Sequence, residues 1–389
     1  MRVSDAPAPA RAYVYLDSQP AFDRFAATLT GTSLLAVDTE AASFHRYRDR
    51  IYLVQLSTRD ATAVVDPLAV ADLGALGRLL ADPAVEVIFH DADYDLRILH
   101  RDYGYTATNL FDTRIAAQLL NEPGIGLAAL LEKYLGVTLD KKYQRADWSV
   151  RPLLAGMLEY AADDTRYLPR LRDILKEALI RAGRWHWAEE EFRLLEQVRW
   201  TTTGPPEEAY LRLKGARALK GHQLAVLREL FAWREQMAAQ LDRAPFRVLM
   251  NEAMLTMAKA MPADEAALRE LKALSADQLR RRGPELLAAV ARGVRAPSES
   301  IPVFERSRRP APDLAYEARL ERLKVVRNQA ADRIPLAPGV LCPNGILEAI
   351  ARVEPTGIEQ LTRVEGMRSW QREVIGEELV QASMGAKAT

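Results

Sequence analysis

The second half of the chain contains an internal repeat, and this repeat limits the possible fold more than any other feature. When residues 225–286 are compared with the stretch 93 positions later, 16 of 62 residues are identical without a gap. The shared positions are mostly apolar residues or helix punctuation, such as Pro245 and Asn251, which recur as Pro338 and Asn344. Self-similarity at a fixed offset is typical of a structural unit that is present twice. We therefore expect two copies of one small helical fold.

The charges of the two copies are not repeated. Arg243 and Arg247 of the first copy correspond to Leu336 and Val340 of the second. The chain as a whole has a net charge of zero, yet residues 201–300 hold 16 Lys and Arg against 12 Asp and Glu. Basic side chains attract polyanions. We expect the first copy to bind phosphates and the second to have a structural or docking role, so that changes at Leu336 or Val340 affect folding.

The first half is predicted to form a mixed sheet with helices packed on it. Five apolar runs have strand composition, and helical patterns separate or follow them; the runs are 13–16, 34–38, 51–57, 63–65 and 85–89. The third run follows the second too closely for a helix between them, which indicates an antiparallel hairpin. Helices are expected from 109 to 120 and, as one long segment, from 153 to about 180.

Two breaks divide the chain into three expected units. The stretch 201–206 is rich in Thr, Gly and Pro, and 295–312 is rich in Pro, Ser and Arg, as in linkers. The units are residues 1–200, 207–294 and 313–386.

Composition and length exclude several classes of protein. A chain of 389 residues with 49% hydrophobic content can bury a large core, so it is neither disordered nor fibrous. The single cysteine, Cys342, excludes an intrachain disulfide, and the histidines have no zinc-finger spacing. Residues 1–10 lack a secretory signal pattern, and no apolar run is long enough to span a bilayer. We expect a cytoplasmic protein without a membrane partner.

Two acids stand at the end of the second strand-like run, which extends to residue 40 when both are included. Side chains alternate along a strand, so Asp38 and Glu40 point to the same side and Thr39 to the other. Adjacent ionised carboxylates repel each other, so one must bind a proton or both must bind a cation. The alternative is an ordinary turn or helix N-cap after a core strand.

Further acids lie on the predicted helices, and their positions along each helix indicate different roles. Asp91 and Asp93 lie where a helix should begin, and capping explains them without any chemistry. Asp95 lies further into that helix beside apolar residues and needs a partner. Tyr160 and Asp164 are four residues apart on a helix, so they share one face.

The acids suit hard cations. Carboxylate oxygens in this number favour Mg²⁺ or Mn²⁺ over zinc, and two such ions can activate a water and stabilise the leaving oxygen of a phosphodiester. No phosphate-binding glycine loop, metalloprotease histidine pair or nucleophile elbow is present in the sequence. The polar loop that contains Lys141, Lys142 and Arg145 is either a phosphate contact or an ordinary solvated loop.

Taken in order, these motifs resemble a known family. Asp38-Thr-Glu40, the segment 90–96 and Tyr160-x₃-Asp164 are similar to the three exonuclease motifs of the DEDD superfamily, Tyr subtype. The run 139–152, followed by Tyr-Ala-Ala-Asp-Asp, resembles the signature of the ribonuclease D family, and the repeated tail resembles its paired HRDC domains. The resemblance covers nearly the whole chain. One departure follows the first motif, where this chain has Ala41-Ala-Ser43 and many relatives have a bulkier residue.

The resemblance implies a fold and an activity. The fold would be an α/β exonuclease domain with an RNase H-like mixed sheet flanked by helices, followed by two small all-α HRDC bundles. The activity would be that of a monomeric 3′→5′ exoribonuclease. It would release nucleoside 5′-monophosphates from single-stranded RNA 3′ ends, including those of tRNA precursors, with two divalent ions, Mg²⁺ or Mn²⁺.

The resemblance also implies roles for individual residues. Asp38, Glu40, Asp95 and Asp164 would hold the metals, Tyr160 would orient or help to deprotonate the attacking water, and Asp163 would be a bystander. Residues expected to bind nucleic acid are Thr39, Gln55, His90, Lys141, Lys142, Arg145, Arg243 and Arg247. Two alternatives stay open at this point, namely a 3′→5′ DNA exonuclease of repair and a non-catalytic nucleic-acid adaptor built from the helical repeats.

Overall fold

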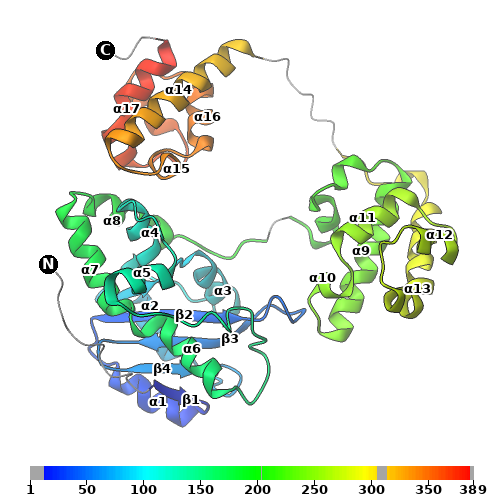
Figure 1. The fold of residues 1–389 in the computed structure, drawn as a ribbon, viewed down its shortest axis with the longest axis horizontal. Helices are drawn as coiled ribbons and strands as arrows, with labels where there is room; N and C mark the ends of the chain where they lie inside the picture. The colour runs from blue at the N-terminus through cyan, green and yellow to red at the C-terminus, as the bar shows by residue number, and fades with distance from the viewer. Residues whose placement is uncertain (1–12, 203, 305–312, 386–389) are drawn as a thin grey trace.

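The computed structural model describes residues 13–202, 204–304 and 313–385. It consists of a mixed α/β domain followed by two small helical domains (Figure 1). The N-terminal stretch 1–12 and part of the second predicted linker, 305–312, lie outside the described residues. No helix in the described part of the chain is both long and apolar enough to cross a membrane.

The first domain is built on a six-stranded mixed sheet with the order β1-β4-β3-β2-β5-β6. Strands β2, β3 and β4 are joined by antiparallel pairing, whereas β1–β4, β2–β5 and β5–β6 are parallel. The predicted hairpin and mixed sheet are therefore confirmed. The strands are β1 Tyr13–Leu16, β2 Leu34–Ala41, β3 Ile51–Ser57, β4 Thr62–Val65, β5 Glu86–Phe89 and β6 Leu110–Asp112.

Three local predictions were wrong in part. Strand β2 continues through both acids to Ala41, because its pairing with β3 extends that far. The short strand β6 occupies the start of the segment expected to be wholly helical. The long helix expected from 153 to about 180 is two helices with a break at Tyr167, because Pro169 has no N–H to continue the helical bonding.

Helices cover both faces of the sheet. Helix α6 packs on β1 to β4 on one face, while α7 packs on β2 and β5 within the main core on the other face. Because both faces are covered, β3 and β4 are buried along their whole length. The helices of this domain are α1 Gln19–Thr28, α2 Gly74–Ala81, α3 Asp93–Tyr103, α4 Thr113–Leu119, α5 Leu127–Leu135, α6 Ala155–Arg166, α7 Leu168–Arg181 and α8 Trp185–Leu195.

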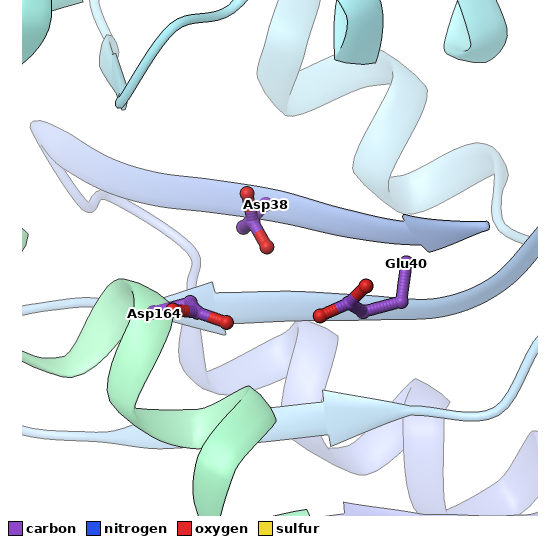
Figure 2. A group of neighbouring side chains, drawn as sticks. All are labelled: Asp38, Glu40 and Asp164. Carbon is purple, nitrogen blue, oxygen red and sulfur yellow. The ribbon is translucent and has the colours of Figure 1, made fainter. Parts of the chain in front are cut away.

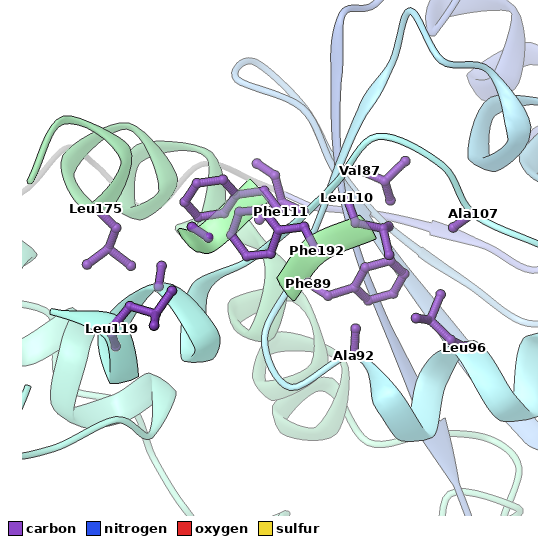
Figure 3. Close-up of a cluster of buried hydrophobic side chains, with 14 of the residues drawn as sticks. Val87, Phe89, Ala92, Leu96, Ala107, Leu110, Phe111, Leu119, Leu175 and Phe192 are labelled. Atoms are coloured by element: carbon purple, nitrogen blue, oxygen red, sulfur yellow. The ribbon is translucent and has the colours of Figure 1, made fainter. Parts of the chain in front are cut away.

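Aromatic side chains fill the core at the β5 and β6 end of the sheet. Phe89, Phe111 and Phe192 lie together there with aliphatic neighbours (Figure 3). The rings of Phe111 and Phe192 are 5.0 Å apart. This contact attaches α8, the last helix of the domain, to the sheet edge.

The two helical domains repeat one architecture, as the sequence predicts. In each, a buried arginine of the first long helix donates to an asparagine 17 residues later, Arg234 to Asn251 and Arg327 to Asn344. The first domain has α9 His222–Leu241, α10 Pro245–Val248, α11 Asn251–Ala260, α12 Glu265–Glu270 and α13 Ala276–Val294, with short 3₁₀ turns before α9. The second has α14 Leu314–Arg333, α15 Pro338–Leu341, α16 Asn344–Val353 and α17 Ser369–Met384.

The helical domains attach to the first domain in different ways. The second shares one continuous hydrophobic core with it, and the rings of Trp187 and Trp370 stack 4.7 Å apart at the junction. The first has a separate core. It contacts the loop between β2 and β3 through polar groups, among them Asp242, which accepts a hydrogen bond from the Tyr47 amide at 3.3 Å.

Candidate active site

Two carboxylates from the sheet and one from a helix form a compact group. Asp38 and Glu40 lie on β2 and face α6, which contributes Asp164 (Figure 2). One carboxylate oxygen from each side chain can be chosen so that all three lie within 4.8 Å of one another. Residues 126 positions apart in the sequence are brought together because α6 packs directly across β2.

The fourth predicted acid approaches from the other side of the strand. Asp95 lies in the first turn of α3 and is only 6% exposed. Its carboxylate accepts a hydrogen bond from the hydroxyl of Thr39, which lies between the two acids of β2. Asp95 is outside the group of three, but its charge raises the pKa values of Asp38, Glu40 and Asp164. Thr39 therefore links the α3 acid to the acids on β2.

The electrostatics of the group oppose ionisation. Burial, together with the neighbouring carboxylates, raises the pKa of Asp38 and of Glu40 well above the usual range. Burial raises the pKa of Asp95 to about 7, and burial with the charges of Asp163 and Asp95 raises that of Asp164 to about 7. Without a cation, some of these acids hold protons near neutral pH.

Tyr160 lies beside this group, one turn before Asp164 on α6. Burial and the charges of Asp164 and Glu40 raise the pKa of its phenol above its usual value, so the phenol keeps its proton at neutral pH. Its ring contacts Tyr143, at 6.2 Å between centroids, and Trp148, at 6.0 Å. These rings fix the direction of the Tyr160 side chain.

A pocket opens next to the acids. It has a volume of about 320 Å³ and is lined by Tyr143, Tyr160, Asp163 and Asp164, among others. Gly156 is also in its wall, and a Cβ atom there would lie 2.8 Å from the Tyr143 hydroxyl oxygen. A larger residue at this position would therefore displace the Tyr143 ring. Asp163, expected to be a bystander, is held at 2.7 Å by Arg166.

The loop 139–152, which contains the predicted cationic residues, is anchored to the sheet. Trp148 is buried, and Arg151 donates to Asp66 through two nitrogens, Nε at 2.5 Å and Nη2 at 2.9 Å. Lys141, Lys142 and Arg145 lie on the exposed part of this loop. Of these three, Lys142 also lines the pocket beside Tyr160.

The other predicted nucleic-acid contacts lie in varied environments. His90 bonds to the Thr113 hydroxyl at 2.9 Å, and burial lowers the pKa of its ring to about 4, so it is neutral at pH 7. Gln55 is fully buried in β3. Arg243 is exposed in the first helical domain, whereas Arg247 donates to the carbonyl oxygen of Phe44.

Sequence reasoning missed three interactions that shape this site. Arg151 with Asp66 anchors the loop, Tyr143 contacts Tyr160, and Thr39 donates to Asp95. Arg151 and Tyr143 lie within the signature run 139–152, and their place in that run could have identified them as residues of the site. The Thr39 bond could not be found from spacing, because it joins residues 56 positions apart across two elements.

The donor set fits divalent cations. The carboxylates of Asp38, Glu40 and Asp164 converge, and Asp95 is hydrogen-bonded to Thr39 between the two acids of β2. Within the described residues none of these four acids forms a salt bridge with Lys, Arg or His. Hard oxygen ligands in this arrangement are those that Mg²⁺ and Mn²⁺ prefer. A cation would also offset the burial and the repulsion that raise the pKa values of the acids.

Comparison with known proteins agrees with this geometry. Residues 13–180 match a family model described as a 3′-5′ exonuclease, and residues 223–290 and 317–382 match the HRDC domain. Ribonuclease D of Granulibacter bethesdensis is 31% identical over 365 residues, which cover 92% of this chain and 89% of that protein. The chain belongs to the ribonuclease D family.

Other members of the ribonuclease D family show the same extent of similarity. The protein of Pseudomonas paraeruginosa is 31% identical over 90% of this chain and 91% of its own length. The crystal structure of Escherichia coli RNase D, described as an exoribonuclease involved in structured RNA processing, matches with a TM-score of 0.71 and 26% identity, covering 96% of this chain and 99% of that one. Together with the 3′-5′ exonuclease domain, family membership makes this chain a 3′→5′ exoribonuclease.

Proposed function

We propose that this chain removes nucleoside 5′-monophosphates one at a time from the 3′ ends of single-stranded RNA, using two divalent cations, Mg²⁺ or Mn²⁺. The observation that carries this proposal is the group of Asp38, Glu40 and Asp164, whose carboxylates lie within 4.8 Å of one another beside Tyr160. Asp95 completes the set from α3. When bound, the cations would acidify the attacking water and stabilise the leaving oxygen.

The protein groups have separate tasks in this proposal. Asp38, Glu40, Asp95 and Asp164 hold the cations and keep them close to the scissile phosphate. The phenol of Tyr160, which keeps its proton at neutral pH, orients the attacking water by a hydrogen bond. The pocket beside it accommodates part of the terminal nucleotide.

We further propose that the natural substrates are structured RNAs with 3′ extensions, such as tRNA precursors, and that the chain acts as a monomer in the cytoplasm. The description of the Escherichia coli relative as an enzyme of structured RNA processing supports the substrate class. Arg243, exposed on the first HRDC domain, and the cationic loop with Lys142 supply positive charge for the RNA backbone.

The decisive experiment is a nuclease assay with defined 3′ ends. A tRNA precursor, an unstructured RNA and a DNA of equal sequence are incubated with Mg²⁺ or Mn²⁺, and EDTA serves as the control. We expect stepwise shortening from the 3′ end, faster on RNA than on DNA and abolished by EDTA. Faster DNA degradation would favour a repair exonuclease instead. No metal-dependent nucleotide release from any strand would refute the proposal.

The division of labour between the HRDC domains is tested by matched substitutions. Replacing Arg243 by Ala should weaken RNA binding and flatten its dependence on salt, because one phosphate contact is lost. Replacing Leu336, which is buried in the second domain, should lower the melting temperature instead. Equal loss of RNA affinity in both variants would contradict this division.

A further inference from the structure

Gln55 is a buried polar side chain that the fold does not use. It lies in the middle of β3 and has no exposed surface. Neither its Oε1 nor its Nε2 atom has a hydrogen-bond partner within the described residues. A buried amide without a partner destabilises a fold, and an apolar side chain of the same size would avoid this cost. The amide therefore needs an explanation other than packing.

The strand register aims Gln55 at the acid group. In the antiparallel β2–β3 pair, Gln55 lies directly opposite Asp38, and Leu53 lies opposite Glu40. Residues directly opposite each other on antiparallel strands point to the same face, with Cβ atoms roughly 5 Å apart. Gln55 is therefore on the face that carries both acids, under helix α6, which contributes Asp164.

Other residues of this face have ordinary structural roles. Leu53 and Val64, which flank Gln55 along and across the strands, pack in an apolar cluster with α6. Ser57 points to the same side two residues further on. Its hydroxyl is bonded to Thr62 at 3.0 Å and to Thr165 of α6 at 2.8 Å. A polar side chain on this face can thus find hydrogen-bond partners within the fold, but the Gln55 amide has none among the described residues.

We propose that Gln55 is a positioning residue: when a divalent cation is bound, its Nε2–H donates a hydrogen bond to the Asp38 carboxylate and holds it in the orientation that binds the cation. This inference rests on the metal-dependent function proposed above. A carboxylate that ligates a metal through one oxygen keeps lone pairs free, and an amide donor beside it fixes its orientation. Because the side chain is buried, it reaches nucleic acid only through the acids that it orients.

The test measures metal binding by the full chain in the absence of RNA. Mn²⁺ is titrated calorimetrically into the wild type, into Gln55→Met, which keeps the size but lacks the amide, and into Gln55→Asn, which keeps the amide but has a shorter reach. Both variants should bind Mn²⁺ at least about tenfold more weakly, as is typical when a partner of a metal ligand is lost. In EDTA, Gln55→Met should melt at the wild-type temperature or above it.

Ser57→Ala is the matched control, because it removes a buried polar group from the same face of the same strand. Its melting temperature should fall, since two hydrogen bonds are lost, and its Mn²⁺ affinity should equal that of the wild type. Wild-type Mn²⁺ affinity in Gln55→Met or Gln55→Asn would overturn the inference and leave the metal site intact. Absence of Mn²⁺ binding by the wild type would overturn the proposed metal site, and the inference with it.

Discussion

The four acids of the candidate site destabilise the fold when no cation is bound. Asp38 and Glu40 point to one side of β2, and Asp164 faces them from α6, so like charges are held close together. Burial first, and then these neighbouring charges, raise the pKa values of the group. Polar groups held unfavourably are a common property of functional sites, where ligand binding removes the conflict.

Replacing Asp38 by Ala should separate activity from stability. We expect the rate of nucleotide release to fall on the order of a thousandfold, because a cation ligand is lost at the reacting phosphate. The melting temperature in EDTA should rise, because one repelling carboxylate is gone. Glu177→Gln is the control, since Glu177 is an exposed acid on α7 that pairs with Arg181, and it should keep nearly full activity. Normal trimming by Asp38→Ala would contradict the assignment.

The metal-free protein should lose stability as pH rises. The carboxyls of Asp95 and Asp164 have pKa values of about 7 in the folded chain and near 4 when unfolded, so the folded state binds more protons between these values. Their contribution is therefore full below about pH 4 and is lost as pH rises through about 7. The melting temperature in EDTA should fall from about pH 5 to about pH 8, and saturating Mg²⁺ should remove most of that fall.

A control separates this effect from that of His90. Burial lowers the pKa of His90 to about 4, so its contribution to stability is lost as pH falls and opposes that of the acids. The relevant measurement is the difference between the wild type and Asp95→Asn/Asp164→Asn, in which His90 is unchanged and both acids with a pKa of about 7 are removed. An equal slope in both proteins would show that the acids do not titrate in this range.

At the scale of elements, the loop after β2 connects the acid strand to the first HRDC domain. Asp242, at the end of α9, accepts hydrogen bonds at 3.3 Å from the Tyr47 amide and from Arg46. The rings of Phe44 and Phe246 meet edge to face, 6.3 Å apart. Because this loop begins two residues after Glu40, the α9–α10 corner restrains the segment that leaves the acid strand.

Asp242→Gly should release this loop without straining the corner. Asp242 has a φ of 44°, a conformation that glycine adopts easily, so the change removes the carboxylate with little backbone cost. The Tyr47 amide should then exchange with solvent about tenfold faster, as measured by hydrogen exchange. Lys272→Gly, at another residue of positive φ in the same domain, is the control and should leave Tyr47 unchanged. Unchanged exchange in Asp242→Gly would show that the contact does not hold the loop.

At the scale of the whole molecule, the two HRDC domains have different attachments although they share one fold. The amides of Ser369 and Trp370, at the N-terminus of α17, donate to Glu190, and Arg368 and the Trp370 indole donate to Glu191. An acid at a helix N-terminus is favourable because it meets free N–H groups and the positive end of the helix dipole. The second domain is therefore docked by both charge and apolar packing.

Glu190→Ala/Glu191→Ala should loosen this docking by about 2–4 kcal/mol, because several charge-assisted hydrogen bonds are lost at once. Small-angle scattering should then give a larger radius of gyration, while each domain keeps its helical content by circular dichroism. Glu189→Ala, an exposed acid on the same helix, is the control. An unchanged radius of gyration in the double variant would mean that the Trp187–Trp370 stack is sufficient for docking.

The sequence by itself determined the mixed sheet, the duplicated helical fold and the motifs of the exonuclease, because these depend on local periodicity, on turn residues and on short spacings. It could not place β6 or the break at Tyr167, since a three-residue strand and one proline give weak signals. Only the tertiary structure decided that Thr39 donates to Asp95, that Gln55 faces Asp38 and that Trp187 meets Trp370. These contacts join residues far apart in the chain, and their partners are set by the packing of sheet, helix and domain.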